Sequence, residues 1–497
     1  MTQFALLFAD APRSPPKVPG QLGSYGWANR AGLLGIAALP WVVLLSMKVN
    51  PLSWITGVGY ERLQFFHRQV SRITIVIWAI HVGGELRTRP GVDEAYLRWG
   101  VAAIVAGGLL LVLGVRLIRT RIYEFFTYLH FFMLVVILPA LWYHIRPQNV
   151  FKVGVEPYLI AAMVFWAFDR ISRMIQLLWL NGLWRFDPRC LEANLSVFGD
   201  RLVHVKLDKP GMGEWSPASH VYLASPPASK TSWLIEAHPF TIATIPRKKI
   251  AAEATESKDL SKLERGSSTS SDLVKSPGDS DQMEFFIRPR SGFTKRLHKV
   301  SKQHGRCELL VYGPFSAPRT FLYTYDTAIL FAAGTGISWV LPQLLHACRT
   351  ADTGMVTLKT LIVVWTIKHV EELEVVRQHI VEVLKTSPVN LQVEIRVHVT
   401  QQTVRGDDFP VEWRKDEESK ADLRQATPVL EQGRPIVDDI IDTHVRAAQG
   451  RVYVGVCGPQ ELAMSVRRAS RRVIKPLEVL RGKQNADVTV HVELYGW

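Results

Sequence analysis

The chain has 497 residues, enough for two or three domains, and its 59 Lys and Arg outnumber its 45 Asp and Glu to give a formal net charge of +14. Its four cysteines show no CxxC spacing, which argues against a disulfide framework and suits a reducing compartment. Neither zinc-finger spacing nor an aromatic and basic RNA signature accompanies the positive charge, so we predict no nucleic-acid partner.

Apolar residues are concentrated before about residue 181, which predicts a membrane-embedded module followed by a soluble one. Residues 1–28 form an N-terminal extension without a compact apolar run, so no cleaved signal peptide is expected. Five stretches could span a bilayer: residues 31–47, 70–86, 101–118, 126–145 and 158–180. Arginines crowd the turn before the fourth stretch and the end of the fifth, which predicts that the carboxyl-terminal half is cytosolic.

Four histidines in the apolar half are spaced as two pairs, His67 with His81 and His130 with His144, fourteen residues apart in each pair. Fourteen helical residues rotate through about 1400°, close to four turns, and rise roughly 21 Å. Each pair therefore projects from one face of its helix, with one imidazole near each membrane surface. A single intramembrane histidine could equally be a satisfied bundle residue. Four at matched spacing and depth favour axial ligands for two haems stacked across the membrane.

The polar residues of the same helices need partners as well. Arg72 and Arg170 would be costly against lipid, so we expect them to face the bundle interior, a haem propionate or the headgroups.

After residue 188 the pattern becomes strand-like, with strands predicted at residues 202–207, 220–224, 240–245 and 283–288. A polar stretch at residues 247–282 has no apolar periodicity and is predicted to be a disordered insertion. From residue 326, strands at 328–332, 361–365, 393–397 and 452–456 alternate with helical patterns, which predicts a parallel α/β sheet. The charged segment 405–434 is predicted to be a surface insertion.

The residues around the four histidines resemble the ferric reductase-like transmembrane family, which includes fungal metalloreductases and NADPH oxidases. The run Phe66-His67-Arg68-Gln69-Val70-Ser71-Arg72 is similar to the family's His-Arg-x-x-Gly-Arg helix start, with Ser71 in place of the usual glycine. Tyr123-Glu124-Phe125-Phe126 before His130 and Trp142-Tyr143-His144 are also similar to the family. The resemblance implies that His67 and His130 bind the iron of an inner haem, and His81 and His144 the iron of an outer haem.

Fungal members of the family usually carry an extracellular region and further membrane helices ahead of the segment that Ala31 begins. The printed sequence does not contain them, so we expect either a short member or an incomplete start.

A second resemblance concerns a flavin. His238-Pro239-Phe240-Thr241 is similar to the family's flavin-binding signature, and Arg288-Pro289-Arg290-Ser291-Gly292-Phe293-Thr294 opens a helical stretch. Phe240 can cover the isoalloxazine ring while Thr241 approaches N5. Gly292 and Thr294 at a helix N-terminus can cradle a diphosphate, because free N–H groups point at the anion. The resemblance thus implies FAD bound by His238, Pro239, Phe240, Thr241, Arg288, Gly292, Phe293 and Thr294. Residues 215–220 depart from the family, which usually has Pro-Gly-Gln-His there.

A third group of residues points to a nicotinamide nucleotide. Gly334-Thr335-Gly336-Ile337-Ser338 follows an apolar strand and precedes a helical pattern, where glycines let the backbone approach a pyrophosphate. A lone GxG is weak, but Gly313-Pro314 and Cys457-Gly458-Pro459 accompany it, and in relatives the latter approaches the nicotinamide.

Lys368 and His369, rather than an acid, follow the strand at residues 361–365, which favours NADPH over NADH. The resemblance adds Arg434 as a phosphate contact and Trp497 as an aromatic residue that stacks on the flavin, although an ordinary tail would also explain Trp497.

These features predict a multi-helix transmembrane haem-binding bundle (residues 29–181), a ferredoxin-reductase-like β-barrel FAD domain (188–318) and a Rossmann-like α/β NADP domain (319–497). We expect an oxidoreductase, an NADPH-dependent ferric or cupric chelate reductase that moves electrons through FAD and two b-type haems to an extracytoplasmic metal. No side chain is expected to act as an acid or base, since the cofactors supply the chemistry. A superoxide-generating NADPH oxidase is the alternative, and a haem-binding membrane sensor or transport subunit is a more remote one.

The expected setting is a multi-pass protein of the plasma membrane with its FAD and NADP half in the cytosol. Its expected partners are the lipid bilayer, a chelated ferric or cupric ion as acceptor, and an iron permease/oxidase pathway.

Overall fold

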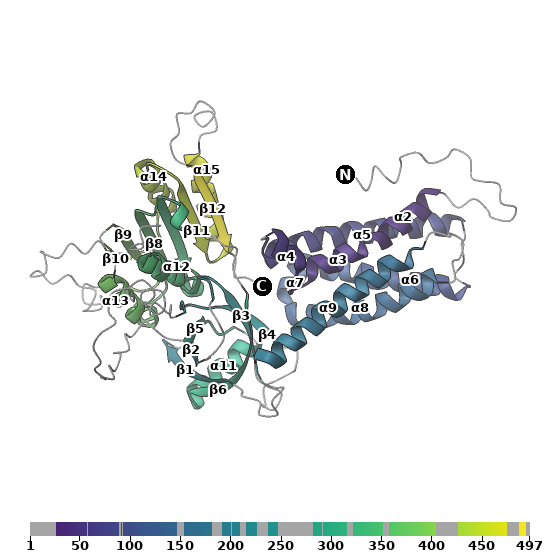
Figure 1. Cartoon of the computed structure of the whole chain (residues 1–497), viewed down its shortest axis with the longest axis horizontal. Coiled ribbons are helices and arrows are strands. Elements are labelled where there is room, and N and C mark those ends of the chain that lie inside the picture. Colours follow the sequence, from purple (N-terminus) through teal and green to yellow (C-terminus); the bar gives the residue numbers. More distant parts are fainter. Residues whose placement is uncertain are drawn as a thin grey trace, which may run out of the picture. The chain divides into compact units, whose positions relative to one another are not determined.

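The computed structural model describes residues 26–56, 58–88, 91, 93–146, 154–180, 191–199, 201–208, 215–225, 237–246, 282–290, 292–315, 322–350, 357–386, 388, 390–403, 426–474 and 487–493. The chain forms two compact units that divide between Gln176 and Leu177 (Figure 1). Helices build the first unit, and two β-sheets with their covering helices build the second.

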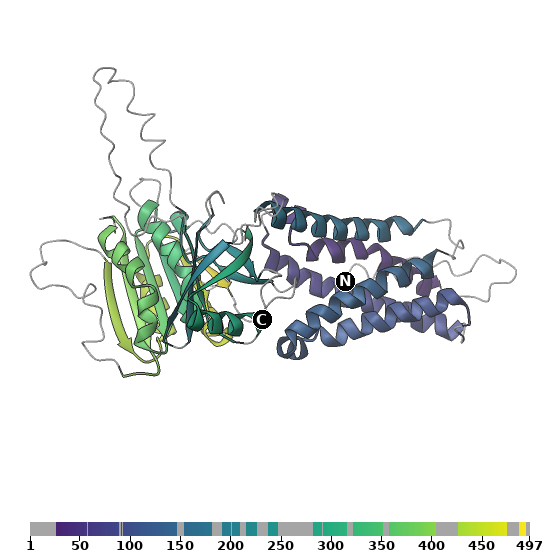
Figure 2. The ribbon, with the colours of Figure 1, turned by 90° about the horizontal axis from the view of Figure 1, so that it is seen from below.

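The first unit is a bundle whose long helices run side by side (Figures 1 and 2). They are α5 (Tyr60–Thr88), α6 (Ala95–Leu113), α8 (Tyr123–Ile145) and α9 (Glu156–Leu180). The shorter helices are α2 (Gly26–Ala37), α3 (Leu39–Ser46), α4 (Pro51–Thr56) and α7 (Arg116–Arg121). Helices α2 and α3 pack on α5, and α6 packs on α8. Trp78, Met133 and Ile137 are buried in the core that these helices share.

The outward faces of this bundle are apolar. Val105, Val112, Val135 and Val164 are each more than half exposed, an arrangement that suits lipid rather than water. In the described part of the chain, three helical stretches are long and apolar enough to cross a membrane: Trp27–Ser46, Ala95–Leu113 and Phe125–Ile145. The other two predicted spans are long helices too, but α5 and α9 carry Arg72 and Arg170 and fall outside that set.

The second unit begins with a six-stranded antiparallel sheet in the order β4-β3-β6-β1-β2-β5. Its strands are β1 (Leu191–Phe198), β2 (Leu202–Asp208), β3 (His220–Ala224), β4 (Ala237–Thr241), β5 (Gln282–Ile287) and β6 (Arg306–Phe315). Beyond β4, the N–H of Ala243 donates to the carbonyl of Glu284 on β5 at 2.8 Å, so the two ends of the sheet meet as in a barrel. Helix α11 (Gly292–Gln303) buries Phe293 and Leu297 in the barrel core.

One strand of the barrel lies earlier than predicted. The sequence predicts residues 240–245, whereas β4 ends at Thr241. Ile242 and Ile245 are buried, which is why the run is typical of a strand, but the N–H of Ile242 donates to Ser219 instead of continuing the ladder.

The rest of the unit is a parallel sheet in the order β10-β9-β8-β7-β11-β12, which confirms the predicted α/β architecture. Its strands are β7 (Thr327–Ala333), β8 (Thr360–Ile367), β9 (Gln392–Val399), β10 (Ala426–Gln432), β11 (Val452–Cys457) and β12 (Val488–Glu493). Helices α12 (Ile337–Thr350) and α13 (Arg377–Thr386) contribute to the core on one face, and α14 (Val437–Ala447) and α15 (Gln460–Val473) to the core on the other.

The chain adds β8, β9 and β10 on one side of β7 and then returns to place β11 on the other side. The direction of winding therefore switches between β7 and β11, and in sheets of this kind ligands bind at that point, beyond the carboxyl ends of the strands.

Strand β10 lies within the segment 405–434, so the prediction of a surface insertion is wrong for residues 426–432. It pairs in parallel with β9 only, as an edge strand of the sheet. An edge strand tolerates polar residues, which is why the composition of β10 does not reveal it as a strand.

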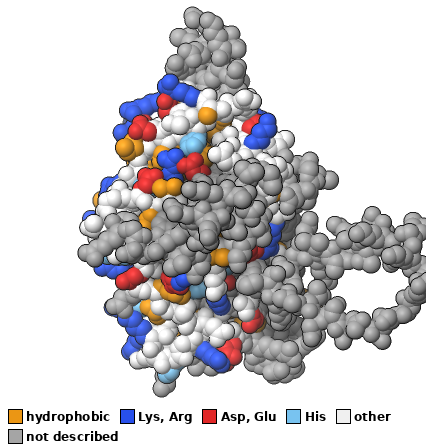
Figure 3. Space-filling view, turned by 90° about the vertical axis from the view of Figure 1, so that its left-hand side faces the viewer, with side chains coloured by type: hydrophobic (Ala, Val, Ile, Leu, Met, Phe, Trp, Pro, Cys, Tyr) orange, Lys and Arg blue, Asp and Glu red, His pale blue; other side chains and the backbone are white. Residues whose placement is uncertain are grey.

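Figure 3 shows the surface on the left-hand side of Figure 1. Acidic and basic side chains are mixed over this face, and its visible hydrophobic side chains form only small groups.

Candidate cofactor sites

The four predicted histidines lie as two facing pairs between α5 and α8. The ring centroids of His67 and His130 are 6.5 Å apart and those of His81 and His144 are 6.2 Å apart, with the ring planes inclined by 71° in both pairs. An imidazole nitrogen lies about 2 Å from a metal that it ligates, so two rings on opposite sides of one metal have centroids roughly 6 Å apart. Both pairs have the separation that axial ligation requires.

Backbone carbonyls orient three of these four imidazoles. The Nδ1 atom of each lies 2.8 to 2.9 Å from a carbonyl oxygen, which belongs to Val42 for His67, to Ala28 for His81 and to Tyr96 for His144. A carbonyl can only accept, so Nδ1 carries the proton and the Nε2 lone pair is left for a metal. No acceptor for the His130 ring is found among the described residues; that ring contacts His67 and Phe126.

Two glycines make room for the rings of the His81 and His144 pair. A Cβ on Gly100 of α6 would lie 2.7 Å from Nδ1 of His144, and a Cβ on Gly32 of α2 would lie 3.0 Å from Nδ1 of His81. A larger residue at Gly100 would collide with the His144 ring, and one at Gly32 would crowd the His81 ring. The facing rings, the oriented Nε2 atoms and this clearance together fit a haem at each pair.

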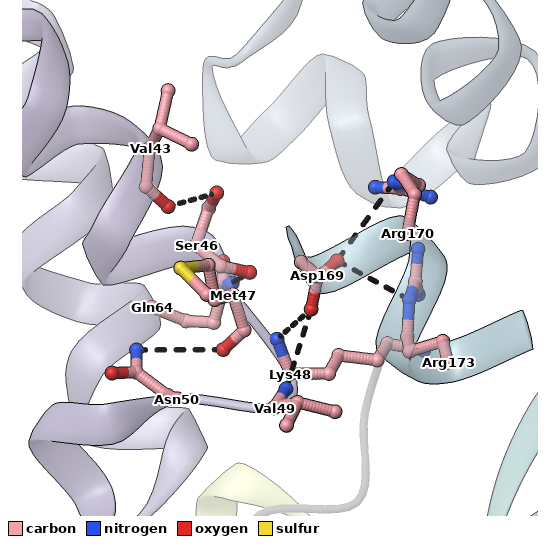
Figure 4. A network of polar contacts seen from close by, with 10 residues as sticks. All are labelled: Val43, Ser46, Met47, Lys48, Val49, Asn50, Gln64, Asp169, Arg170 and Arg173. Atoms are coloured by element: carbon pink, nitrogen blue, oxygen red, sulfur yellow. Dashed lines mark hydrogen bonds and ion pairs between the residues drawn. The ribbon is translucent and has the colours of Figure 1, made fainter. Parts of the chain in front are cut away.

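An ionic network ties α9 to the turn between α3 and α4 (Figure 4). The buried carboxylate of Asp169 accepts the backbone N–H groups of Lys48 and Val49 at 2.9 and 3.3 Å. It also pairs with Arg173 at 3.2 Å and Arg170 at 3.8 Å. Helix α3, which orients His67 through Val42, is thereby fixed to the last helix of the bundle.

The expectation that Arg170 avoids lipid is met only in part. Its guanidinium lies 4.9 Å from the ring centroid of Phe131 on α8, but its side chain is 42% exposed.

The two flavin motifs, far apart in the sequence, lie in contact in the barrel. The ring of His238 on β4 stacks on Phe293 at the start of α11, with centroids 5.3 Å apart, and the ring of Phe240 lies 6.1 Å from Phe293. Pro239 pairs with Tyr222 across the β3–β4 ladder, and Thr241 at the end of β4 is buried. The signature thus lies beside the N-terminus of α11, the end of a helix that favours a diphosphate.

The start of α11 has the conformation that such a cradle needs. Gly292 adopts a φ of +54°, and the Thr294 hydroxyl accepts the N–H of Arg290 at 2.9 Å. Gly313 on β6 has a φ of +129°, and a Cβ there would lie 3.2 Å from the carbonyl oxygen of His220. Gly313 and Pro314 therefore occupy a close approach between β6 and β3, the strand next to the flavin signature.

The two predicted nucleotide loops meet at the switch point of the parallel sheet. Gly334–Gly336 follows β7, and Cys457-Gly458-Pro459 follows the neighbouring strand β11. A Cβ on Gly336 would collide with the carbonyl oxygen of Cys457, and a Cβ on Gly458 would lie 3.0 Å from the Cβ of Ala333. The two loops are packed backbone to backbone, which only glycine allows.

The first loop leads directly into α12. Gly334 has a φ of +53°, and its carbonyl accepts the indole N–H of Trp365 at 2.9 Å. The Ser338 hydroxyl donates to the carbonyl of Thr335 at 2.9 Å, and Ile337 is buried at the helix start. The N-terminal end of α12 thus lies beyond β7, where the helix dipole favours an anion such as a pyrophosphate.

Two further predicted cofactor contacts, Arg434 and Trp497, are not placed beside the two glycine loops by the described residues. Arg434 is exposed between β10 and α14, at the same edge of the sheet as the two loops but beyond β8 and β9. Trp497 lies outside the described residues.

Sequence reasoning missed a buried carboxylate in the second unit. Glu284 on β5 accepts hydrogen bonds from Nε2 of His204 on β2 at 2.7 Å and from Nε2 of His379 on α13 at 3.2 Å. Burial alone would raise the pKa of the Glu284 carboxyl, but the hydrogen bonds and charges of the two histidines outweigh it and hold that pKa below its usual range. An acid inside the otherwise apolar run of β5 was the available signal.

Within the described ranges, no group of three or more His, Cys, Asp or Glu side chains could hold a metal ion by itself.

An apolar helical bundle, an antiparallel barrel and a parallel sheet with two glycine loops define a class: membrane proteins that join flavin-binding and nicotinamide-nucleotide-binding domains to apolar helices. Residues 31–141 match the family of the ferric reductase like transmembrane component, residues 189–319 match an FAD-binding domain, and residues 325–471 match the ferric reductase NAD binding domain. These matches cover more than three quarters of the chain in the family's order. The chain belongs to the ferric reductase-like family.

Among its relatives, ferric/cupric reductase transmembrane component 1 of Candida albicans is 23% identical over 95% of this chain and 57% of its own length. Ferric/cupric reductase transmembrane component 7 of Saccharomyces cerevisiae is 24% identical over 76% of this chain and 55% of its own length. The chain thus spans little more than half the length of these relatives. A crystal structure of a ferredoxin NADP+ reductase from Neisseria gonorrhoeae with bound FAD and NADP is 8% identical over 60% of this chain and 97% of that chain, with a TM-score of 0.35.

Proposed function

We propose that this chain is a transmembrane, NADPH-dependent reductase of chelated ferric or cupric ions. The observation that carries the proposal is the two facing imidazole pairs on α5 and α8, in a chain that also holds flavin and nicotinamide domains. The relatives named ferric/cupric reductase support the choice of acceptor.

The geometry supports the following assignment of residues to each cofactor. His67 with His130, and His81 with His144, would ligate two haems. The β4 signature and the start of α11 would hold FAD, and the loops after β7 and β11 would hold NADPH. When bound, nicotinamide and flavin supply the change from a two-electron donor to single electrons, and haem supplies one-electron carriage across the membrane.

The chain's own residues would bind the cofactors, orient the imidazoles and exclude water. The carbonyls of Val42, Ala28 and Tyr96 fix three imidazoles in the tautomer that leaves Nε2 free. Phe240 and Phe293 form an apolar wall beside the flavin signature. No described side chain is needed as an acid or base, because the protein fixes positions and the cofactors react.

We propose the domain bounds 29–181, 188–318 and 319–497, with the second unit on the cytosolic side of the plasma membrane. The basic helix α7, with Arg116, Arg119 and Arg121, supports this orientation because cytosolic flanks of membrane helices are rich in arginine. His67 and His130 would then lie toward the cytosol, and His81 and His144 toward the outside. An iron permease/oxidase pathway is the proposed user of the reduced metal.

The test combines spectra with turnover. Reduced-minus-oxidised spectra of membranes with the wild type, His67→Ala and His81→Ala should show low-spin bis-histidine haem, with one of two haems lost in each variant. His304→Ala, an exposed histidine of the second unit, is the control and should keep both. NADPH should drive ferric-chelate reduction that superoxide dismutase does not diminish.

Loss of that signal with dismutase would point to the NADPH oxidase alternative. Membranes in which NADPH reduces no haem would refute both enzyme functions.

A further inference from the structure

Glu284 belongs to the flavin barrel, and its backbone holds the segment that follows the flavin signature. Its carbonyl accepts the N–H of Ala243 at 2.8 Å, two residues beyond Thr241 at the end of β4. The hydroxyl of the next residue, Thr244, donates to the carbonyl of Gln282 at 2.9 Å, also on β5. Two hydrogen bonds therefore join this part of β5 to the chain that carries the flavin signature.

The side chain of Glu284 contacts both the barrel and the nucleotide domain, which is the parallel sheet with its helices. Its Oε2 accepts the Nε2–H of His204 on β2 at 2.7 Å, and its Oε1 lies 3.8 Å from Nζ of Lys206 on the same strand. These contacts hold the carboxylate in place from the barrel side. The Nε2–H of His379 on α13 donates to the same Oε2 at 3.2 Å. The contact with His379 thus crosses from the barrel to the nucleotide domain.

Helix α13 is connected in turn to the helix that follows the first nucleotide loop. Arg349 in the last turn of α12 pairs with Glu382 of α13 at 2.8 Å, and each side chain is no more than 25% exposed. Helix α12 begins directly after Gly334–Gly336. A continuous set of packed elements therefore runs from the flavin signature through Glu284 and His379 to the nucleotide loop, which is the kind of network that can couple two sites.

Apolar contacts surround the crossing hydrogen bond. Phe286 of the barrel shares a buried core with Val376 and Ile380 of the nucleotide domain. Apolar contacts stabilise an interface without fixing a direction, whereas a hydrogen bond to a charged group prefers one distance and angle. The apolar core can therefore hold the two domains together, but the bond from His379 is better suited to set their orientation.

A second polar contact crosses the same interface nearer to solvent. Nη2 of Arg288 donates to Glu372 in the short helix η5 (Val370–Val375) at 3.2 Å. The Arg288 side chain is 34% exposed, whereas that of Glu284 is 7% exposed. Solvent and salt screen buried groups less, so the contact made by Glu284 is the stronger constraint of the two.

Resting on the proposed passage of electrons from NADPH to FAD, we propose that His379 is a positioning residue for that step. Its hydrogen bond to Glu284 sets how the nucleotide domain lies on the flavin barrel, and thereby how the nicotinamide and flavin sites face each other. In this role His379 acts through Glu284 and α13. Each cofactor is bound within its own domain, so loss of the bond should slow the reaction and leave both affinities unchanged.

The test uses the full-length protein in nanodiscs and separates rate from binding. Stopped-flow measurements give the rate of FAD reduction at saturating NADPH without oxygen, and calorimetry gives the affinity for NADP+. His379→Leu should reduce that rate by about 10- to 100-fold, since a misplacement of about 1 Å can cost on the order of 100-fold. FAD content and NADP+ affinity should stay at the wild-type values.

Two further variants identify the cause. His379→Gln places an amide N–H near the position of Nε2, so it should restore most of the rate. Gln378→Leu, at an exposed neighbouring position of α13, is the matched control and should behave as the wild type does.

Several results would overturn the proposal. A wild-type rate in His379→Leu would show that the bond does not position the domains. Equal losses in His379→Leu and His379→Gln would exclude the hydrogen bond as the cause, and a parallel loss of FAD or of NADP+ affinity would indicate a purely structural role. If His379→Leu does not fold, His379→Asn decides, because its shorter amide cannot reach Glu284 and a wild-type rate would count against the contact. A wild type whose FAD is not reduced by NADPH would instead refute the proposed function.

Discussion

Replacing Gly100 by alanine perturbs the proposed outer haem site without removing a ligand. The added Cβ would lie 2.7 Å from Nδ1 and 2.8 Å from Cε1 of His144, where ordinary contact begins at 3.4 Å. The ring cannot swing away freely, because its Nδ1 donates to the carbonyl of Tyr96 at 2.9 Å. Tyr96 and Gly100 lie on the same helix, α6, so moving that helix away also stretches this hydrogen bond.

The magnitude follows from these contacts. Relief of the collision needs a shift of about 0.7 Å, the difference between 3.4 and 2.7 Å. Overpacking of this kind costs about 1–3 kcal/mol, and loss of the Tyr96 hydrogen bond costs about 1 kcal/mol. A total of about 2–4 kcal/mol lowers the affinity for the outer haem by roughly 30- to 700-fold. We expect the inner haem to be retained, since Gly100 contacts neither of its ligands.

The assay is the ratio of haem to protein by pyridine haemochrome, together with a reduced-minus-oxidised spectrum. The ratio should fall from two toward one in Gly100→Ala. Gly108→Ala is the matched control, because it makes the same change on the same helix at a place where a Cβ meets nothing within 4 Å. If Gly100→Ala keeps two haems and a wild-type spectrum, His144 does not hold haem in the orientation described.

Three further predictions concern the second unit. Glu284→Gln should lower the free energy of unfolding by about 3 kcal/mol at pH 7, since it breaks a buried pair. Because the pKa of Glu284 is lowered on folding, its stabilisation is present above its ordinary value of 4.5 and is lost as the pH falls further; denaturation curves that match the wild type at pH 7 would contradict this. Gly336→Ala should abolish NADP+ binding but not FAD binding, because the new Cβ collides with the Cys457 carbonyl; calorimetric NADP+ affinity equal to that of the wild type would disprove the collision. Burial, and then Glu308, raise the pKa of the Cys307 thiol to about 12, so iodoacetamide should label it only slowly at pH 8, and rapid labelling of Cys307 by mass spectrometry would count against this environment.

The parts of the fold that sequence predicts well are those that local geometry determines. Helical rotation relates residues fourteen apart, so the facing of His67 with His130 and of His81 with His144 follows once two helices pack. A glycine loop between an apolar strand and a helix is equally local, which is why Gly334–Gly336 was found at the end of β7.

The parts that sequence does not reveal depend on which elements become neighbours. Gly32 and Gly100 are ordinary small residues of apolar helices until α2 and α6 are known to pass behind His81 and His144. The hydrogen bonding of Glu284 likewise cannot be predicted until α13 is known to bring His379 to β5. Strand β10 was missed because only its pairing with β9 distinguishes it from the polar segment before it.

The contacts of β5 with α13 and η5 show how charged side chains can determine which elements become neighbours. Residues 284 and 288 are four apart, so in an extended chain their side chains share a face. Glu284 meets His379 of α13, and Arg288 meets Glu372 of η5, so the two contacts have opposite polarity. A slip of four residues along β5 would set Arg288 against the histidine or Glu284 against Glu372, and like charges or unpaired buried groups would result. These two contacts, one from β5 and one from the residue that directly follows it, therefore favour one register of this segment against α13 and η5, and in that register the Arg288 guanidinium lies against Gly334.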